Sequence, residues 1–347
     1  MQADKPSASR NSSRRDFIRR SALGIMGVSL ASRTYPLYVN ANNRVVVVRH
    51  KNVFGPDGFA QQQLVLDMVN HGITELTTAG NLSDAWLPFF QPEDIIGMKI
   101  NAISFKGLTN TPLASHYPVL TNAIISSCAE AGIEEKQFLI WDRSDSELAN
   151  LGYTPSNDTD RLRIFGTYKH HRRTDGIGFH PEQHPAGKKS TRISRILSDI
   201  CTAMINIPVI KPHTLAGITA ALKNHYGTID NPSSFHLGAC TDPGIPEINA
   251  IPVIRNKQKL VICNALQAIY KGGVSWKWAN AWPYGGIILG TDPVAVDRIC
   301  LKIINEKRWQ SNKGIIDNRA RHILLSEQLG IGVASLDKID LFEIDLV

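Results

Sequence analysis

The stretch that decides the fold spans residues 204–227 and reads MINIPVIKPHTLAGITAALKNHYG. Its opening segment, MINIPVI, is apolar and partly β-branched, which predicts a buried strand. This predicted strand runs directly into Lys211 and His213. In open α/β sheets, ligands bind outside the carboxyl ends of the strands. The two basic side chains therefore mark a candidate binding site.

A helix is predicted to follow this strand. Thr214 is a suitable N-cap, an apolar stripe with helical spacing comes after it, and Gly227 is a suitable stop. Thr219 and Lys223 are four residues apart, so a helix would present them on one face. Because the N–H groups at a helix start favour negative charge, we expect this junction to bind a small anion.

Residues 1–41 have the pattern of a twin-arginine export signal. Arg14 and Arg15 precede a mildly apolar run at residues 22–31, and small residues at 39–41 offer a cleavage site. We therefore expect recognition by the twin-arginine export machinery and a periplasmic or otherwise exported mature protein. A basic disordered tail is the alternative interpretation. The apolar run is too short to span a bilayer, and no later segment is long enough, so no transmembrane segment is expected in the mature chain.

The positive charge of the chain lies mainly in this N-terminal segment. The whole chain carries a formal charge of +7, and residues 1–41 contain seven basic and two acidic side chains. The mature chain is therefore close to neutral. Binding to nucleic acid requires a concentrated basic face, and the sequence shows none. We do not expect a nucleic-acid partner.

The cysteines do not form a recognisable metal or cluster motif. All five lie outside the predicted signal, and none pairs as C-x-x-C. Their mostly apolar surroundings favour buried free thiols over a disulfide framework or a zinc site. An iron–sulfur cluster with the usual cysteine spacing is excluded.

Strands and helices alternate through the rest of the chain. The predicted strands are short and continuously apolar, which is typical of a parallel sheet buried on both faces. They cover residues 45–48, 95–100, 138–141, 205–210, 259–263 and 287–289. We expect a single α/β domain over residues 42–347, with a mostly parallel sheet and helices on both faces.

Polar side chains stand at the ends of most of these strands. If the sheet is parallel, they meet at one edge. They are Lys99 and Asn101, Asp142, Lys211 and His213, Asn264 and, after the last strand named, Asp292. The structural alternative is that strands simply end where polar residues begin.

These residues receive roles according to their chemistry. Lysines can hold or polarise an anion, and histidines can move protons. The predicted catalytic residues are Lys211, His213, Lys223 and His236. The predicted substrate-binding residues are Lys99, Asn101, Asp142, Thr219, Asn224 and His225. Asp292 and Asp297 are predicted to orient a lysine or bind a divalent metal.

Structural explanations remain open for several of these residues. The histidines can be hydrogen-bonded core residues, and Asp292 before a proline is a standard helix start. Asp297 can be exposed on its helix or face a lysine. No nucleophile elbow, phosphate-binding loop or dinucleotide glycine fingerprint is present. The cofactor is therefore left open.

The chain resembles the domain-of-unknown-function 362 family over nearly all of its predicted mature length. The blocks that carry the resemblance are Asp94–Asn101, Ile140–Arg143, Asn206–His213, Gly217–Gly227 and Thr291–Asp297. The resemblance implies an α/β fold of unestablished activity, sometimes found beside ferredoxin modules. The ferredoxin cysteines are missing here, so cluster binding is not implied. Asn264 replaces the aspartate that the family usually carries, which puts a metal or proton role there in doubt.

Three functional hypotheses follow. The first is an exported enzyme that acts on a small anionic substrate in a pocket rich in lysine and histidine, with or without a metal or cofactor. The second is a periplasmic redox-accessory protein that carries a cofactor or metal without turnover. The third is a structural protein, which predicts that the lysines are exposed and far apart.

Overall fold

The computed structural model describes residues 43–103, 107–170, 175–272 and 280–347. The predicted export signal lies outside the described residues. Within them, no helix is both long enough and apolar enough to cross a membrane.

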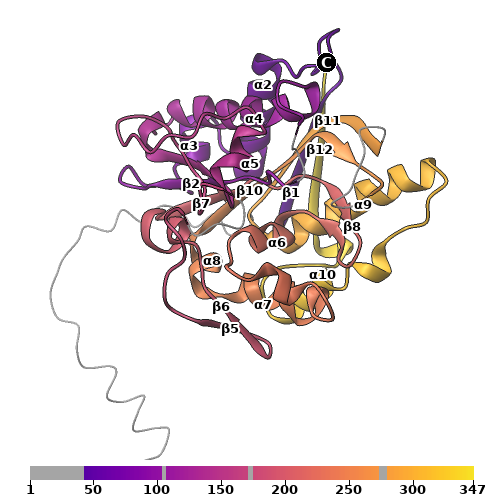
Figure 1. Cartoon of the computed structure of the whole chain (residues 1–347). Coiled ribbons are helices and arrows are strands. Elements are labelled where there is room, and N and C mark those ends of the chain that lie inside the picture. Colours follow the sequence, from indigo (N-terminus) through magenta and orange to yellow (C-terminus); the bar gives the residue numbers. More distant parts are fainter. Residues whose placement is uncertain (1–42, 104–106, 171–174, 273–279) are drawn as a thin grey trace, which may run out of the picture. The chain divides into compact units, whose positions relative to one another are not determined.

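An eight-stranded sheet forms the centre of the fold, in the order β12-β1-β11-β10-β7-β2-β3-β4 (Figure 1). The strands are β1 (Arg44–His50), β2 (Ile96–Lys99), β3 (Phe138–Trp141), β4 (Arg163–Ile164), β7 (Ala203–Asn206), β10 (Gln258–Ile269), β11 (Ala281–Gly290) and β12 (Asp340–Leu346). Only β11 runs against its neighbours; every other adjacent pair is parallel. The predicted α/β class with a mostly parallel sheet is confirmed.

Side chains alternate across the sheet and feed two separate hydrophobic cores. In β1, Val45 and Val47 belong to one core, and Val46 and Val48 belong to the other. This is the period of two that a strand imposes, and burial on both sides explains why the strand is continuously apolar.

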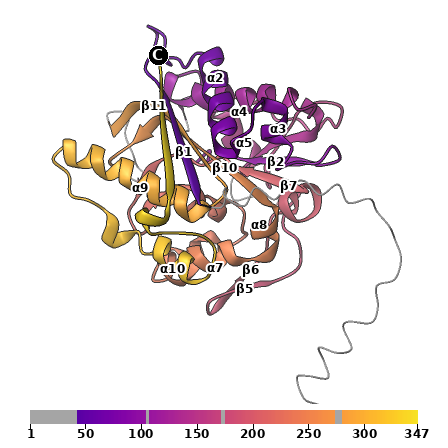
Figure 2. The ribbon, with the colours of Figure 1, turned by 180° about the vertical axis from the view of Figure 1, so that it is seen from behind.

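Helices cover both faces of the sheet, as Figures 1 and 2 show from opposite sides. One layer contains α2 (Gln62–Thr77), α3 (Leu82–Trp86) and α4 (Pro112–Ala129). The other contains α7 (Ile245–Ala250), α8 (Pro252–Lys257), α9 (Pro293–Gln310) and α10 (His322–Gln328). The predicted coverage of both faces is therefore confirmed.

Shorter elements complete the chain. They are α5 (Asp145–Ala149), α6 (Ala221–Asn224), the strand pair β5 (His184–Ala186) and β6 (Lys189–Thr191), and the strand pair β8 (Lys211–His213) and β9 (Gly217–Thr219). Single 3₁₀ or π turns cover Glu135–Gln137, Ile196–Ile200, His225–Gly227, Pro232–Phe235, Cys240–Gly244, Asp317–Arg319 and Leu336–Lys338.

The helix predicted from Thr214 to Gly227 is wrong for residues 214–220, and only the short helix α6 forms after them. The segment forms a β8–β9 hairpin instead, in which Lys211 pairs with Thr219. Two local features favour the turn. His213 Nδ1 accepts hydrogen bonds from the backbone N–H groups of Leu215 and Ala216. Gly217 has a φ of 72°, a left-handed conformation that glycine adopts readily. Thr219 and Lys223 therefore do not share a helix face.

Three of the predicted strand ends lie elsewhere than expected. The strand predicted at residues 205–210 ends at Asn206, and Lys211 and His213 belong to the separate strand β8. Because β11 is antiparallel, its carboxyl end leads to Asp292 at the edge opposite to the ends of β2 and β3. Asn264 is not at a strand end, since β10 continues through it to Ile269. There Asn264 pairs with Ile287 and hydrogen-bonds to His116 across 2.9 Å.

Candidate functional site

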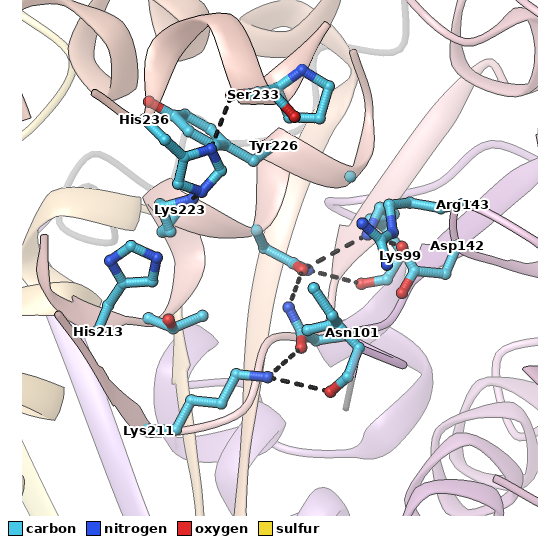
Figure 3. A pocket seen from close by; sticks show the side chains of 15 residues that line it. Lys99, Asn101, Asp142, Arg143, Lys211, His213, Lys223, Tyr226, Ser233 and His236 are labelled. Atoms are coloured by element: carbon cyan, nitrogen blue, oxygen red, sulfur yellow. Dashed lines mark hydrogen bonds and ion pairs between the residues drawn. The ribbon is translucent and has the colours of Figure 1, made fainter. Parts of the chain in front are cut away.

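A cavity of about 130 Å³ opens where the carboxyl ends of β2 and β3 meet β8, β9 and α6 (Figure 3). Its lining comes from segments distant in sequence. The lining residues are Lys99, Asn101, Ile103, Asp142, Arg143, Lys211, His213, Thr219, Lys223, Asn224, Tyr226, Gly227, Pro232, Ser233 and His236. This set brings together every residue predicted for catalysis or substrate binding except His225.

Neighbouring parallel strands explain part of this convergence. Lys99 is the last residue of β2 and is paired with Trp141, the last residue of β3. Asp142 follows directly, so its carboxylate lies beside the lysine. Lys211 and Lys223 arrive from β8 and α6, whose positions depend on the hairpin and not on a strand end.

Lys99 and Asp142 form a buried ion pair at the floor of the cavity. Lys99 Nζ lies 2.7 Å from Asp142 Oδ1, and it also donates to the carbonyl of Ile100 across 2.7 Å. The second carboxylate oxygen accepts the backbone N–H of Ala102 across 2.6 Å. Burial lowers the pKa of Lys99, and the charge of Asp142 opposes that effect.

Asparagine amides connect this ion pair to Lys211. Lys211 Nζ donates to Asn101 Oδ1 across 2.8 Å, and the amide of Asn101 donates to Asn224 Oδ1 across 3.0 Å. Asn224 in turn donates to Asn206 across 2.7 Å. Burial brings the pKa of Lys211 down to about 7, against the opposing charge of Asp142. A chain of neutral amides therefore orients this amine and leaves its charge sensitive to whatever occupies the cavity.

The amine of Lys223 lies beside the imidazole of His236, whereas that of Lys99 lies beside the carboxylate of Asp142. Lys223 Nζ lies 3.4 Å from His236 Nε2 and 3.3 Å from the centre of the Tyr226 ring. His236 Nδ1 lies 2.8 Å from the carbonyl of Pro232, which places the ring proton on Nδ1 and leaves Nε2 as an acceptor. Burial lowers the pKa of Lys223 to about 7.

His213 has the opposite tautomer. Its Nδ1 accepts the N–H groups of Leu215 and Ala216, across 3.2 and 3.1 Å, so the ring proton is on Nε2. Burial, helped by the charge of Lys223, lowers the pKa of His213 to about 3. At neutral pH the ring is therefore uncharged, and its remaining hydrogen-bonding group is a donor.

Arg143 and Tyr226 line the cavity but were not among the predicted site residues. Arg143 forms a two-pronged ion pair with Glu147 one turn along. A signal for it was present, because a basic residue directly follows Asp142 at a strand end. No sequence pattern indicated that the Tyr226 ring would lie against the ammonium group of Lys223.

Three predicted residues do not line the cavity. His225 is fully buried and bonds to Gln258 Oε1 across 2.9 Å. Asp292 caps α9 through the N–H groups of residues 294 and 295 and also accepts the N–H of Val333. Asp297 is buried rather than exposed, and no lysine of the described residues pairs with its carboxylate.

The buried carboxylate of Asp297 supports the element that carries Lys223. It accepts the N–H of Ala221 across 2.6 Å and that of Leu222, and it lies 3.6 Å from His322 Nε2. Ala221 and Leu222 are the first two residues of α6. In the part of the chain that the structure describes, no group of three or more His, Cys, Asp or Glu side chains is arranged to hold a metal ion. The metal roles of Asp292 and Asp297 stay predictions without geometric support.

The fold and the cavity define an α/β protein with a pocket lined by lysine and histidine side chains at the carboxyl edge of a mostly parallel sheet. The model of the domain-of-unknown-function 362 family matches residues 96–302, which is more than half of the chain and includes every lining residue of the cavity. The chain belongs to this family, which confirms the resemblance seen in the sequence.

Other comparisons add little. No curated protein matches the chain. Among solved structures, the chain is similar to a Thermotoga maritima protein whose crystal structure was determined by the Northeast Structural Genomics Consortium, at 13% identity and a TM-score of 0.39. The match covers 71% of this chain and 59% of that one. So distant a likeness carries no functional argument.

Proposed function

We propose that the protein is an enzyme that acts on a small anionic substrate bound in this cavity. The observation that carries the proposal is the convergence of Lys211 and Lys223 on one cavity in which, among the described lining residues, Asp142 is the only carboxylate. That carboxylate already bonds to Lys99 and to a backbone N–H. A bound anion would therefore meet two amines that burial has desolvated, while that carboxylate is engaged with other partners.

Desolvation gives the amines a reason to bind an anion. Burial destabilises the ammonium form of both lysines, and a negative group nearby would stabilise it again. Anion binding is then coupled to proton uptake by whichever of the two lysines holds the anion. The cavity volume of about 130 Å³ favours a small substrate over a polymer.

The side chains can divide the chemical work. Lys211, held by Asn101, suits the role of an electrostatic anchor for the anionic group. His236 Nε2 can accept a proton, and the N–H at His213 Nε2 can donate a hydrogen bond. The residues that the sequence predicts to be catalytic therefore keep these roles in the proposal, and the distances given above support them.

Export remains part of the proposal. The twin-arginine pattern of residues 1–41 supports a periplasmic or otherwise exported location. The alternative is a redox-accessory protein that carries a cofactor or metal; its metal version gains no support from the described side chains, because none form a ligand group for a metal.

Titration calorimetry with oxalate, phosphate and sulfate tests the anion site. We expect at least one of them to bind, and Lys211→Met or Lys223→Met to weaken that binding by about 10- to 100-fold, since each removes a charge-assisted hydrogen bond. Lys259→Met is the matched control, because Lys259 is exposed and donates only to a nearby carbonyl.

The affinity should also fall as the pH rises through about 7, because both lysines lose their protons there. Binding that is unchanged in both pocket variants, or equally weakened in the control, would contradict the proposal.

A further inference from the structure

The groups around Lys223 have the arrangement of an activated amine. A nucleophile, a base within reach of it and a third group that orients the base are the recurring parts of nucleophilic catalysis. Here the nucleophile is Lys223 Nζ, the base is His236 Nε2 at 3.4 Å, and the orienting group is the carbonyl of Pro232 at 2.8 Å from Nδ1. Lys223 comes from α6, and the other two parts come from the turn Pro232–Phe235 and the residue that follows it.

Burial favours the neutral amine of Lys223, which is the nucleophilic form, and outweighs the contact with the Tyr226 ring, which favours the ammonium. No Asp or Glu oxygen of a described residue lies within 4 Å of its Nζ, in contrast to Lys99. With a pKa of about 7, about half of the Lys223 amines are neutral at pH 7, against roughly one in three thousand for an ordinary lysine. Lys99, held by Asp142, is the lysine of this cavity least suited to attack.

The rest of the cavity suits a substrate that carries both a carboxylate and a carbonyl. Lys211 and Arg143 supply positive charge on other sides of the cavity, as Figure 3 shows. His213 offers an N–H at Nε2, because its Nδ1 is taken up by two backbone donors. A neutral donor of this kind stabilises a carbonyl oxygen as negative charge develops on it.

We propose that Lys223 forms an imine with the carbonyl carbon of a small oxo acid whose carboxylate is held by Lys211. The inference rests on the proposed function and names its substrate class. Neither the family nor its name assigns such a step. His236 acts through Lys223 in this scheme and is therefore a positioning and proton-transfer residue for the amine.

The step balances without an oxidant or a reductant. The amine nitrogen attacks the carbonyl carbon, a C–N bond forms, and the C=O π pair moves to oxygen. The two N–H protons pass through His236 Nε2 to that oxygen, which leaves as water. The products are a C=N bond to Lys223 and one water molecule.

Reductive trapping tests the step directly. The full-length protein, or its mature form, is incubated with pyruvate and sodium cyanoborohydride at neutral pH, and adducts are located by intact mass and peptide mapping. We expect one adduct per chain, on Lys223. Lys223→Arg keeps a cation but cannot form the imine, so it should bind oxalate and trap no pyruvate.

Two further variants separate the parts of the site. Lys211→Met should raise the pyruvate concentration needed for trapping by about tenfold, because it removes the anchor for the carboxylate. At saturating pyruvate, His236→Phe should slow trapping by about 100-fold relative to the wild type at pH 7, and this ratio should shrink at high pH, where hydroxide removes the proton. A purely structural histidine would not change the pH profile. Lys259→Met should trap as the wild type does.

The outcomes distinguish this inference from the proposed function. Oxalate binding without an adduct on Lys223 would overturn the imine and leave the anion site in place. Adducts spread over exposed lysines, or unchanged trapping in Lys223→Arg, would also overturn it. Absence of both oxalate binding and trapping would overturn the two proposals together. If a variant does not fold, the peptide map of the wild type still decides which lysine reacts.

Discussion

Lys99 and Lys223 are two buried lysines of the same cavity, yet their ammonium groups meet different partners. Lys99 Nζ bonds to the carboxylate of Asp142 and to a backbone carbonyl, whereas Lys223 Nζ faces the Nε2 of His236 and the face of Tyr226. Both lose hydration on burial. The comparison teaches that burial alone does not assign a role to a lysine; the charge and proton capacity of its partner do.

The two pairs also differ in what they contribute to the pocket: one stabilises the fold and the other can react with a ligand. The Lys99–Asp142 pair serves the structure. Its carboxylate also accepts the N–H of Ala102 and so fixes the loop after β2. The Lys223–His236 pair leaves both groups able to exchange a proton with a ligand. We therefore expect mutations of the first pair to affect folding most and mutations of the second to affect binding most.

The largest expected effect is on stability, in Asp142→Asn. The substitution leaves the ammonium group of Lys99 buried without a countercharge, which should lower the free energy of unfolding by about 3–5 kcal/mol. Urea unfolding followed by circular dichroism measures it. The double variant Lys99→Met with Asp142→Leu removes both charges and should recover most of the loss. If Asp142→Asn is as stable as the wild type, the Lys99–Asp142 pair does not have the structural role that distinguishes it from the Lys223–His236 pair.

The next effect is a pH dependence of stability that comes from Lys211 and Lys223. Their folded pKa values of about 7 lie below the ordinary value of 10.5, so the unfolded chain binds more protons between these limits. Stability should therefore rise from about pH 7 towards pH 10, by up to about 1.4 kcal/mol per pH unit for each lysine.

Comparing the stability of the wild type with that of a variant isolates the contribution of one lysine from other groups that titrate in the same pH range. The groups that act on Lys223 or touch it are Lys211, Arg143, His213, His236, Tyr226 and Cys240. The wild type should gain stability over Lys223→Met as the pH rises from 7 to 9 in urea unfolding. Parallel curves for the two proteins would show that Lys223 keeps an ordinary pKa.

A smaller effect is expected at the carboxylate that supports α6. Asp297→Asn weakens the hydrogen bonds to Ala221 and Leu222, which should cost about 1–3 kcal/mol of stability. Because Lys223 follows directly, anion affinity should fall as well. Calorimetry and urea unfolding measure the two losses. Asp345→Asn, at an exposed ion pair, is the control and should change neither.

The smallest effect is expected for Arg143→Met. The charge of Arg143 lowers the pKa values of Lys211 and Lys223, so its removal should raise both slightly. The pH at which anion binding is half lost should then move upward, while Arg161→Met, at an exposed site, should leave it in place. A downward shift would mean that Arg143 affects the lysines mainly through structure.

Much of the fold was predictable, because continuous apolar strands and their polar ends follow from short-range composition. The prediction succeeded for β2 and β3, whose ends carry Lys99 and Asp142. It failed for residues 214–220, where helical spacing of apolar residues competes with the pairing of Lys211 with Thr219. Intrinsic helix preference is weak, and tertiary context overrides it.

The site was predicted as a set of residues and not as an arrangement. Lysines and histidines near strand ends could be named in advance, and the cavity collects nearly all of them. Asp292 was placed at the wrong edge because strand direction in a hairpin such as β10–β11 does not follow from the apolar pattern of each strand.

The sequence by itself determined that strands and helices alternate, that the sheet is buried on both faces, and that polar groups stand at the ends of β2 and β3. Only the tertiary structure decided which polar groups meet: Lys99 with Asp142, and Lys223 with His236. The physical reason is that composition acts on neighbouring residues along the chain. Desolvation and proton sharing, in contrast, depend on groups brought together from distant segments.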